Sequence, residues 1–185
     1  MPQDTTERPD SRREDTMILH TIGHSNLSMP ELLKALSDHG VFCVVDVRSS
    51  PRSYRFPHFD RPELAAALER VGISYRYMGD TLGGKPATGD DSRGWKQGKV
   101  DPHIVSSLSR SKRWAEGMEA LKRLLREWNR QMQSVCLLCS EADPNKCHRS
   151  LIALELLPQL PHLTLNHITP KKQHRKEVSF QKTLL

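Results

Sequence analysis

Apolar residues cluster along the chain in short runs, which alternate with longer stretches where apolar positions recur three or four residues apart. Short runs of this kind are typical of strands buried in a parallel sheet, and the longer spacing is typical of amphipathic helices. Five segments are predicted as strands: residues 18–22, 41–45, 73–77, 135–138 and 163–168. With helices between them, the chain is expected to form an α/β fold, a three-layer α/β/α domain with a mainly parallel sheet of about five strands.

Polar residues mark the expected helix starts. Ser28 has Glu31 three residues behind it, and Asp60 has Glu63 at the same spacing, so both pairs are predicted capping boxes. The longest helix is predicted to begin at Ser111, and its apolar stripe indicates core packing rather than a cofactor site. Residues 41–45 form an unbroken apolar run, which is expected to be buried on both faces of the sheet.

Composition and charge divide the chain into a body and two tails. Residues 1–16 are polar and are predicted to be a disordered tail, residues 17–169 to be a single α/β domain, and residues 170–185 to be a basic tail. The net charge of +6 permits contact with nucleic acid without requiring it. No apolar run is long enough for a membrane span, so no membrane partner is expected, and the cytoplasm is the expected location. Four cysteines in 185 residues indicate thiols rather than a disulfide scaffold.

Reactive and anion-binding residues follow each of the first four predicted strands. Because the carboxyl ends of parallel strands share one edge of the sheet, these residues are expected to line one cleft there. They are His24 and Ser25 after the first strand, Asp46, Arg48 and Ser49 after the second, Gly83 and Gly84 after the third, and Cys139, Glu141, Cys147, His148 and Arg149 after the fourth.

Four of these residues are candidates for catalysis. Cys147 lies at the predicted start of a helix, where the dipole favours a thiolate, so Cys147 or Cys139 is a candidate nucleophile. The alternative is that these thiols pack as small apolar groups. Glu141 and His24 are candidates for proton exchange, and a histidine that only bonds backbone is the alternative for His24.

The other candidates are predicted to bind an anion. Arg48 and Arg149 offer guanidinium forks that suit phosphate or carboxylate, although internal ion pairs with Asp46 or Glu141 are an equal alternative. The glycine pair is predicted to present backbone N–H groups, with a simple turn as the alternative. The anion-binding set is Arg48, Arg149, Asp46, Ser49, Ser25, Gly83, Gly84 and His148.

A zinc site is an alternative, because Cys136, Cys139, Cys147 and His148 are all of residue types that bind zinc. Residues three apart on a strand point to opposite faces, so Cys136 and Cys139 are not expected to converge. The seven residues between Cys139 and Cys147 also differ from the spacing of paired zinc knuckles. No tightly bound metal is therefore expected, and any cofactor remains unknown.

Four ordered motifs carry a resemblance to a known family. They are Gly23-His24-Ser25-Asn26, Asp46-Val47-Arg48-Ser49-x-Pro51, Leu82-Gly83-Gly84, and Cys139-x-Glu141-x-x-Pro144-x-x-Cys147-His148-Arg149. Together they resemble a large bacterial and archaeal family of uncharacterised proteins, domain of unknown function 488, over roughly residues 17–169. The resemblance implies an α/β fold with a set of polar motifs, and it implies no particular reaction.

The function predicted from these residues is an enzyme, a hydrolase or transferase, that acts on a phosphate-bearing ligand at the carboxyl edge of the sheet. The ligand is expected to be a phosphate-bearing small molecule, such as a nucleotide, or a nucleic acid. One alternative is a non-catalytic nucleic-acid-binding module, which the basic tail and the arginine-aromatic loop at residues 52–59 favour. Another is a small metal-binding regulatory protein that uses the cysteines and histidine.

Overall fold

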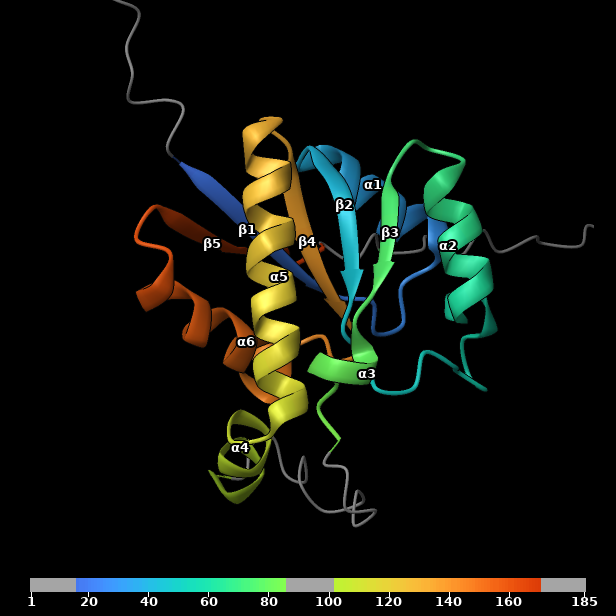
Figure 1. Ribbon diagram of the computed structural model, residues 1–185. Helices are drawn as coiled ribbons and strands as arrows, with labels where there is room; N and C mark the ends of the chain where they lie inside the picture. The colour runs from blue at the N-terminus through green and yellow to red at the C-terminus, as the bar shows by residue number, and fades with distance from the viewer. Residues whose placement is uncertain (1–15, 86–101, 171–185) are drawn as a thin grey trace, which may run out of the picture.

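The computed structural model describes residues 16–85 and 102–170, and these residues form one five-stranded sheet with helices on both faces (Figure 1). Every strand pairing is parallel, and the strand order is β3-β2-β4-β1-β5. The strands are β1 (Met17–Gly23), β2 (Val41–Asp46), β3 (Ser74–Tyr77), β4 (Ser134–Cys139) and β5 (Leu163–His167). The predicted three-layer α/β/α fold is therefore confirmed.

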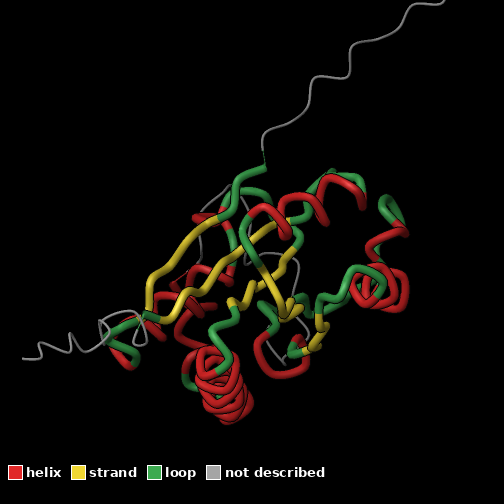
Figure 2. The backbone as a smooth tube through the Cα atoms, turned by 90° about the horizontal axis from the view of Figure 1, so that it is seen from above, coloured by secondary structure: helices red, strands yellow, loops and turns green. Residues whose placement is uncertain are grey.

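Two pairs of helices cover the sheet, one pair on each face, as the view from above shows (Figure 2). The helices α1 (Met29–Asp38) and α2 (Arg61–Glu69) pack on one face, and α5 (Lys112–Arg130) and α6 (His148–Leu156) pack on the other. Two shorter helices are α3 (Gly79–Leu82) and α4 (Pro102–Ser109), and three short 3-10 helices are Pro57–Phe59, Pro144–Lys146 and Leu157–Gln159. The sequence does not predict α3 or α4, because helices of four and eight residues show little periodicity in their apolar positions.

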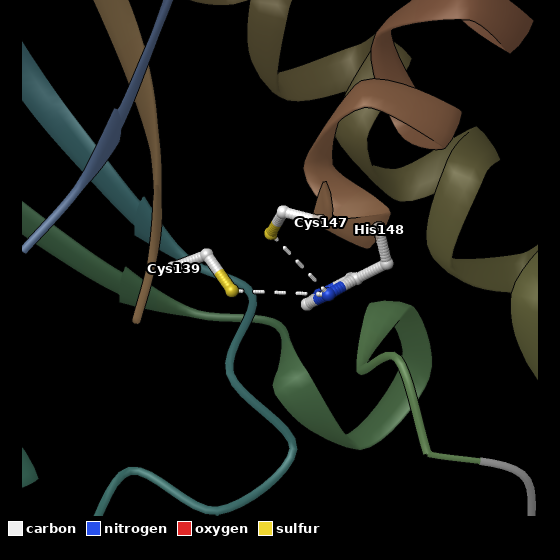
Figure 3. Close-up of side chains that lie close together, drawn as sticks. All are labelled: Cys139, Cys147 and His148. Carbon is white, nitrogen blue, oxygen red and sulfur yellow. Dashed lines mark hydrogen bonds between the residues drawn. The ribbon is translucent and has the colours of Figure 1, made fainter. Parts of the chain in front are cut away.

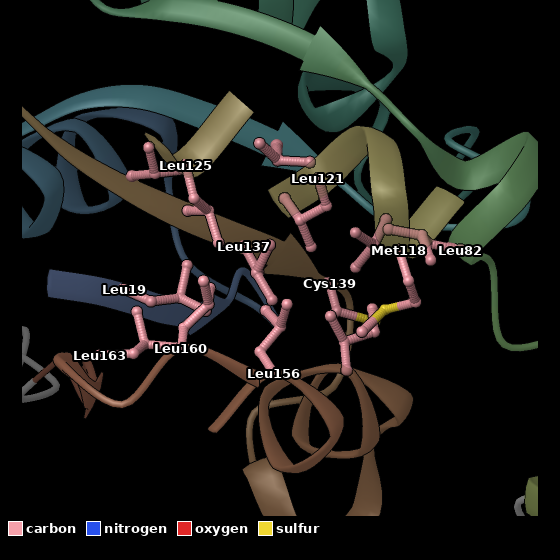
Figure 4. Packing of buried hydrophobic residues seen from close by; sticks show 14 of the residues in the cluster. Leu19, Leu82, Met118, Leu121, Leu125, Leu137, Cys139, Leu156, Leu160 and Leu163 are labelled. Carbon is pink, nitrogen blue, oxygen red and sulfur yellow. The ribbon is translucent and has the colours of Figure 1, made fainter. Parts of the chain in front are cut away.

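The core is divided by the sheet into two clusters, because successive strand residues point to opposite faces. On β4, Leu137 packs toward α5 and α6, whereas Leu138 packs toward α1 and α2. Figure 4 shows the first cluster, in which Leu121 and Leu125 of α5 meet Leu137. The central strands are covered on both faces and hold their carboxyl ends in fixed positions.

The helix starts are partly as predicted. Ser28 and Glu31 form the expected capping box at α1, and the Ser111 hydroxyl accepts from the Trp114 N–H at 3.2 Å. Asp60 lies at the N-cap of α2, but its side chain makes no cap bond, so the predicted capping box there is wrong. The Asp60 carboxylate accepts from the backbone N–H of Ser53 at 2.6 Å instead, which ties down the preceding loop.

One predicted buried position is exposed. Phe42 in β2 has 44% of its surface accessible, although the run at residues 41–45 was expected to be buried on both faces. The pairing of β2 with β4 shifts register between Val41 and Cys43, and Phe42 lies at that irregularity. The outward turn of its side chain follows from this local break in the alternation.

The topology creates a crevice at the carboxyl ends of β2 and β4. These neighbouring strands continue in opposite directions across the sheet, β2 to β3 and β4 to β5. At such a switch point the connections that follow the two strands lie on opposite faces of the sheet, which leaves a crevice between them. Ligands of open α/β sheets bind in this crevice. Most of the two predicted tails falls outside the described residues, at 1–15 and 171–185. Within residues 16–85 and 102–170, no helix has the length and apolar character needed to cross a membrane.

Candidate functional site

Two thiols and an imidazole meet where β4 ends and α6 begins. Cys139 is the last residue of β4, Cys147 is the N-cap of α6, and His148 is the first residue of that helix. All three are buried, and the Nδ1 atom of His148 lies 3.8 Å from the Sγ atom of each cysteine (Figure 3). Their three donor atoms lie within 4.8 Å of one another, so the turn between Cys139 and Cys147 brings the two sulfurs together.

The orientation of the His148 ring is fixed from two sides. Its Nε2 atom lies 2.8 Å from the carbonyl oxygen of Val47, just after β2. Since a carbonyl only accepts, Nε2 carries the hydrogen, and Nδ1 faces the thiols with its lone pair when the ring is neutral. Gly84 lies against the ring, where a Cβ atom would come within 2.7 Å of Nδ1, so a larger residue would displace the imidazole.

The thiols of this cluster do not share one acidity. The hydrogen bond from Cys147, followed by the nearby His148, holds the pKa of Cys139 well below its usual range. The same hydrogen bond, together with burial, raises the pKa of Cys147. Burial alone would lower the pKa of His148, but the Cys139 thiolate outweighs it and raises that pKa. Negative charge in the cluster is therefore concentrated on the Cys139 sulfur.

The other two cysteines are core residues. Burial raises the pKa of Cys43 to about 11 and raises that of Cys136 further. Cys136 packs in the cluster under α1 and α2, on the opposite face of the sheet from Cys139, as the strand alternation predicted.

An open cavity of about 360 Å³ lies beside the two thiols and the imidazole. Six of the residues that line it were predicted site residues, and two lysines and a serine were not. The lining residues are Ser49, Gly84, Lys85, Cys139, Ser140, Glu141, Lys146, Cys147 and His148. Both lysines are exposed and sit directly beside predicted motifs, Lys85 after Gly84 and Lys146 before Cys147. Adjacency to the motifs was thus the signal in the sequence that could have found them.

Asp46 and Arg48 form a buried ion pair rather than an open anion site. The Nε and Nη2 atoms of Arg48 donate to the two carboxylate oxygens of Asp46, at 2.9 and 2.6 Å. The Nη1 atom donates to the Phe59 carbonyl at 2.8 Å, and the Tyr75 hydroxyl donates to Asp46 at 2.7 Å. The geometry therefore favours the internal ion pair, one of the two interpretations that the sequence left open.

His24 is enclosed by this ion pair. Its Nε2 atom lies 3.3 Å from Nη1 of Arg48, its Nδ1 atom lies 3.2 Å from the Ser25 carbonyl, and its ring packs on Phe59. Burial first, and then the Arg48 charge, lower the pKa of His24 to about 4. A neutral imidazole with both nitrogens in use favours the structural interpretation of His24 over proton exchange.

Arg149 is turned into the protein and holds the turn after β4. It is 1% exposed, and it donates from Nη1 to the Glu141 carbonyl and from Nη2 to the Ala142 carbonyl, the latter at 2.8 Å. Its Nε atom has no hydrogen-bond partner among the described residues. Gly23 crosses the same turn, where a Cβ atom would come within 1.7 Å of the Glu141 carbonyl oxygen. The partners of Arg149 among the described residues are carbonyl oxygens, whereas the sequence left an internal carboxylate and a ligand open as its partner.

The remaining predicted anion-binding residues have local partners. The Ser49 hydroxyl accepts from the backbone N–H of Lys85 at 3.0 Å, and the Gly83 N–H donates to the Gly79 carbonyl at 3.0 Å. Ser25 adopts a left-handed φ of 43°, and its N–H donates to the Ser140 carbonyl at 2.9 Å. In these positions Ser49, Gly83 and Ser25 shape the loops around the crevice.

A second cavity, of about 520 Å³, lies next to the first, and Ser140 lines both. It is lined by His24, Ser25, Asn26, Arg52, Ser53, Arg55, Phe56 and Ser140. The Arg55 guanidinium lies 5.5 Å from the centre of the Phe56 ring, and Tyr54 beside them is fully exposed. Arg52, Tyr54 and Arg55 of the arginine-aromatic loop are therefore exposed next to the site of the two thiols, whereas Phe59 at the end of the loop is buried.

The family model described as "Domain of unknown function DUF488" matches residues 28–156, well over half of the chain. The chain belongs to this family. The DUF488 match includes β2, β4 and the start of α6, and with them Cys139, Glu141, Cys147 and His148. No curated protein and no solved structure matches the chain. Membership of DUF488 brings no reaction with it, because function depends on the residues of a site and not on the family or the fold.

Proposed function

We propose that this DUF488 protein is an enzyme that acts on a phosphate-bearing ligand, a nucleotide or nucleic acid, in the cavity beside Cys139, Cys147 and His148. One observation carries the proposal: two thiols, an imidazole and a carboxylate line the same open cavity as two ammonium groups. Titratable groups that gather in a cleft at a switch point of an α/β sheet are typical of an active site. Hydrolysis or group transfer is the reaction class that these groups serve.

The lysines, Glu141 and the thiols that line the cavity have different roles in this proposal. Lys85 and Lys146 supply positive charge for phosphate, and Lys146 is only loosely paired, with its Nζ atom 3.8 Å from Asp143. Glu141 is exposed in the same cavity and exchanges the proton that the reaction releases or takes up. The thiols act either as a nucleophile or as ligands of a metal ion. In both cases the reaction takes place in this cavity.

Anion binding is tested by thermal unfolding with inorganic phosphate and with a nucleoside monophosphate. Both are expected to raise the melting temperature of the wild-type protein, because a ligand that binds the folded state stabilises it by RT ln(1 + [L]/Kd). The double variant Lys85→Gln/Lys146→Gln is expected to lose most of this shift. The matched control is Lys34→Gln on α1, an exposed lysine near a groove at the other end of the strands. An equal shift in the double variant, or none in the wild type, would contradict the proposal.

A second candidate function is nucleic-acid binding without catalysis. It is favoured by the second cavity, where Arg52 and Arg55 stand beside Phe56 and the exposed Tyr54. Guanidinium groups interleaved with aromatic rings suit phosphates and stacked bases of a single strand. Because Ser140 joins this cavity to the first, the same loop also suits the longer substrate of an enzyme.

A further inference from the structure

We infer that Cys139, Cys147 and His148 bind one zinc ion and leave its fourth coordination position open to the cavity. Tetrahedral zinc, with Zn–S of about 2.3 Å and Zn–N of about 2.0 Å, separates sulfur from nitrogen by roughly 3.5 Å. In this structure Nδ1 of His148 is 3.8 Å from both sulfurs, and the three donor atoms lie within 4.8 Å of one another. Small side-chain adjustments therefore suffice to close this set around an ion.

The histidine is already oriented as a metal ligand. A ligating imidazole typically donates its other N–H to a carboxylate or backbone carbonyl, which fixes the tautomer and the ring. His148 does this through Nε2 to the Val47 carbonyl at 2.8 Å, and Nδ1 is left facing both thiols. Gly84 lets the chain pass close to the ring without pushing it away.

The backbone that carries the two cysteines is held by other groups. The Asp143 side chain accepts from the Asn145 N–H at 3.0 Å, and the Cys147 N–H donates to the Pro144 carbonyl. Arg149 donates to the carbonyls of Glu141 and Ala142 between them, so hydrogen bonds within the protein support the turn that brings Cys139 back to Cys147. Two thiolates and one Zn²⁺ have no net charge, which suits a site buried this deeply.

The sequence argues against zinc, since Cys136 and Cys139 are not expected to converge. Cys136 does lie on the other face of the sheet. The set that converges instead is formed by the strand end and the helix start, across the seven residues that separate Cys139 from Cys147. Those seven residues contain the turn and the 3-10 helix Pro144–Lys146, which contacts β1 and α6.

Three donors from the chain with one open position are the pattern of a catalytic zinc, whereas structural sites have four protein ligands. The open position faces the cavity that Glu141 lines. In the reaction of the proposed enzyme, on which this part of the inference rests, a zinc ion held by Cys139, Cys147 and His148 would activate a water molecule, and Glu141 would accept the proton that the water loses. The water oxygen would form a bond to the phosphorus of the ligand, the bond from phosphorus to the leaving oxygen would break, and Glu141 would return the proton to that leaving oxygen.

Metal content is measured first on the full chain, purified without chelators. About one zinc per wild-type chain is expected, and well below one in Cys147→Ser and in His148→Gln. Cys136→Ala is the matched control: it removes a buried thiol from the other face and is expected to retain the zinc. Glu141→Gln is also expected to retain it, since Glu141 is not a ligand. Less than about a tenth of an ion in the wild type, or an equal loss in Cys136→Ala, would overturn the inference.

A second measurement uses only the wild-type chain, so the folding of the variants does not matter. Metal-free protein is titrated with Co²⁺. Two signals are expected: a thiolate-to-cobalt charge-transfer band and the strong visible absorption of tetrahedral cobalt. Added zinc is expected to remove both signals. Zinc is also expected to slow the alkylation of Cys139 and Cys147, as read by peptide mass spectrometry. Weak absorption of octahedral type, or alkylation that zinc does not change, would refute the site. If zinc binds but phosphate does not raise the melting temperature, the metal site is supported and the proposed function is contradicted. If phosphate raises the melting temperature but zinc does not bind, the proposed function is supported and the metal site is contradicted.

Discussion

His20 is a buried histidine in β1 that stays neutral in the folded protein. The Nδ2 atom of Asn166 lies 3.1 Å from its Nδ1 atom, and an amide nitrogen can only donate, so Nδ1 accepts. Burial first, and then the neighbouring His39, lower the pKa of His20. In the unfolded chain the ring takes up a proton near its usual pKa of about 6.5.

The stability that His20 contributes is therefore present above pH of about 6.5 and is lost as the pH falls below it, because the unfolded state then binds more protons. His20→Gln keeps a polar group beside Asn166, and its free energy of unfolding is expected to fall less between pH 7.5 and pH 5.5 than that of the wild type. Urea unfolding at the two pH values measures this. His162→Gln, at an exposed position, provides the control for replacing an imidazole by an amide. A parallel fall in His20→Gln and wild type would contradict the prediction.

Single residues were the hardest part of the site to predict. The sequence could show that Asp46 and Arg48 follow a buried strand, but not which way the guanidinium turns. That direction depends on Phe59 and Tyr75, which come from the loop before α2 and from β3 and supply a carbonyl acceptor and a hydroxyl donor. His24 is buried in turn because its ring contacts the inward-pointing Arg48 guanidinium. Contacts between side chains so far apart in the sequence leave no local pattern to read.

At the scale of the elements, Arg149 joins the end of β4 to the start of α6. A cation in the first turn of a helix faces the positive end of the dipole, so it needs compensation, and two carbonyl oxygens provide it. Arg149→Met would leave the carbonyls of Glu141 and Ala142 unpaired. Hydrogen bonds to charged groups contribute about 1.5–3 kcal/mol each, so a loss of roughly 3 kcal/mol or more is expected.

Urea unfolding compares Arg149→Met with Arg130→Met, an exposed arginine at the end of α5, which is expected to cost about 0.5 kcal/mol or less. Arg149→Lys should restore little of the free energy of unfolding that Arg149→Met loses, because an ammonium group lacks the planar fork that reaches both carbonyls. If Arg149→Met costs no more than Arg130→Met, the turn is held by other contacts, such as the close crossing at Gly23.

Elements were the most predictable level of the structure. Apolar runs located all five strands, and Ser28 and Ser111 marked two helix starts, because burial and capping leave local patterns. The parallel order of the sheet then brought Ser49, which follows β2, and Gly84, which follows β3, to the same edge as Cys139, as expected from the shared carboxyl ends. The short helices α3 and α4 were missed because they are too short to show a period.

For the whole molecule, the two adjacent cavities and the positive charge raise the question of how long the ligand is. The net charge is +6, and residues 170–185 carry four lysines and one arginine against one glutamate. Arg52 and Arg55 line the second cavity, whereas Lys85 and Lys146 line the first. A nucleotide needs only one cavity, but a single strand would contact both, and these two cases differ in their dependence on salt.

Binding of a labelled single-stranded oligonucleotide is therefore measured by fluorescence anisotropy at increasing salt. Each phosphate contact lowers the slope of log K against log salt by about 0.7 for single strands, because bound counterions are released. Arg52→Gln/Arg55→Gln is thus expected to flatten the slope by roughly 1.4. Arg123→Gln/Arg126→Gln removes the same charge from exposed positions of α5 and should leave the slope nearly unchanged. Removing residues 170–185 should flatten it as well. If no binding is found even at low salt, nucleic acid is excluded both as a bound partner and as the substrate. The proposal is then restricted to a small phosphate-bearing ligand in the first cavity.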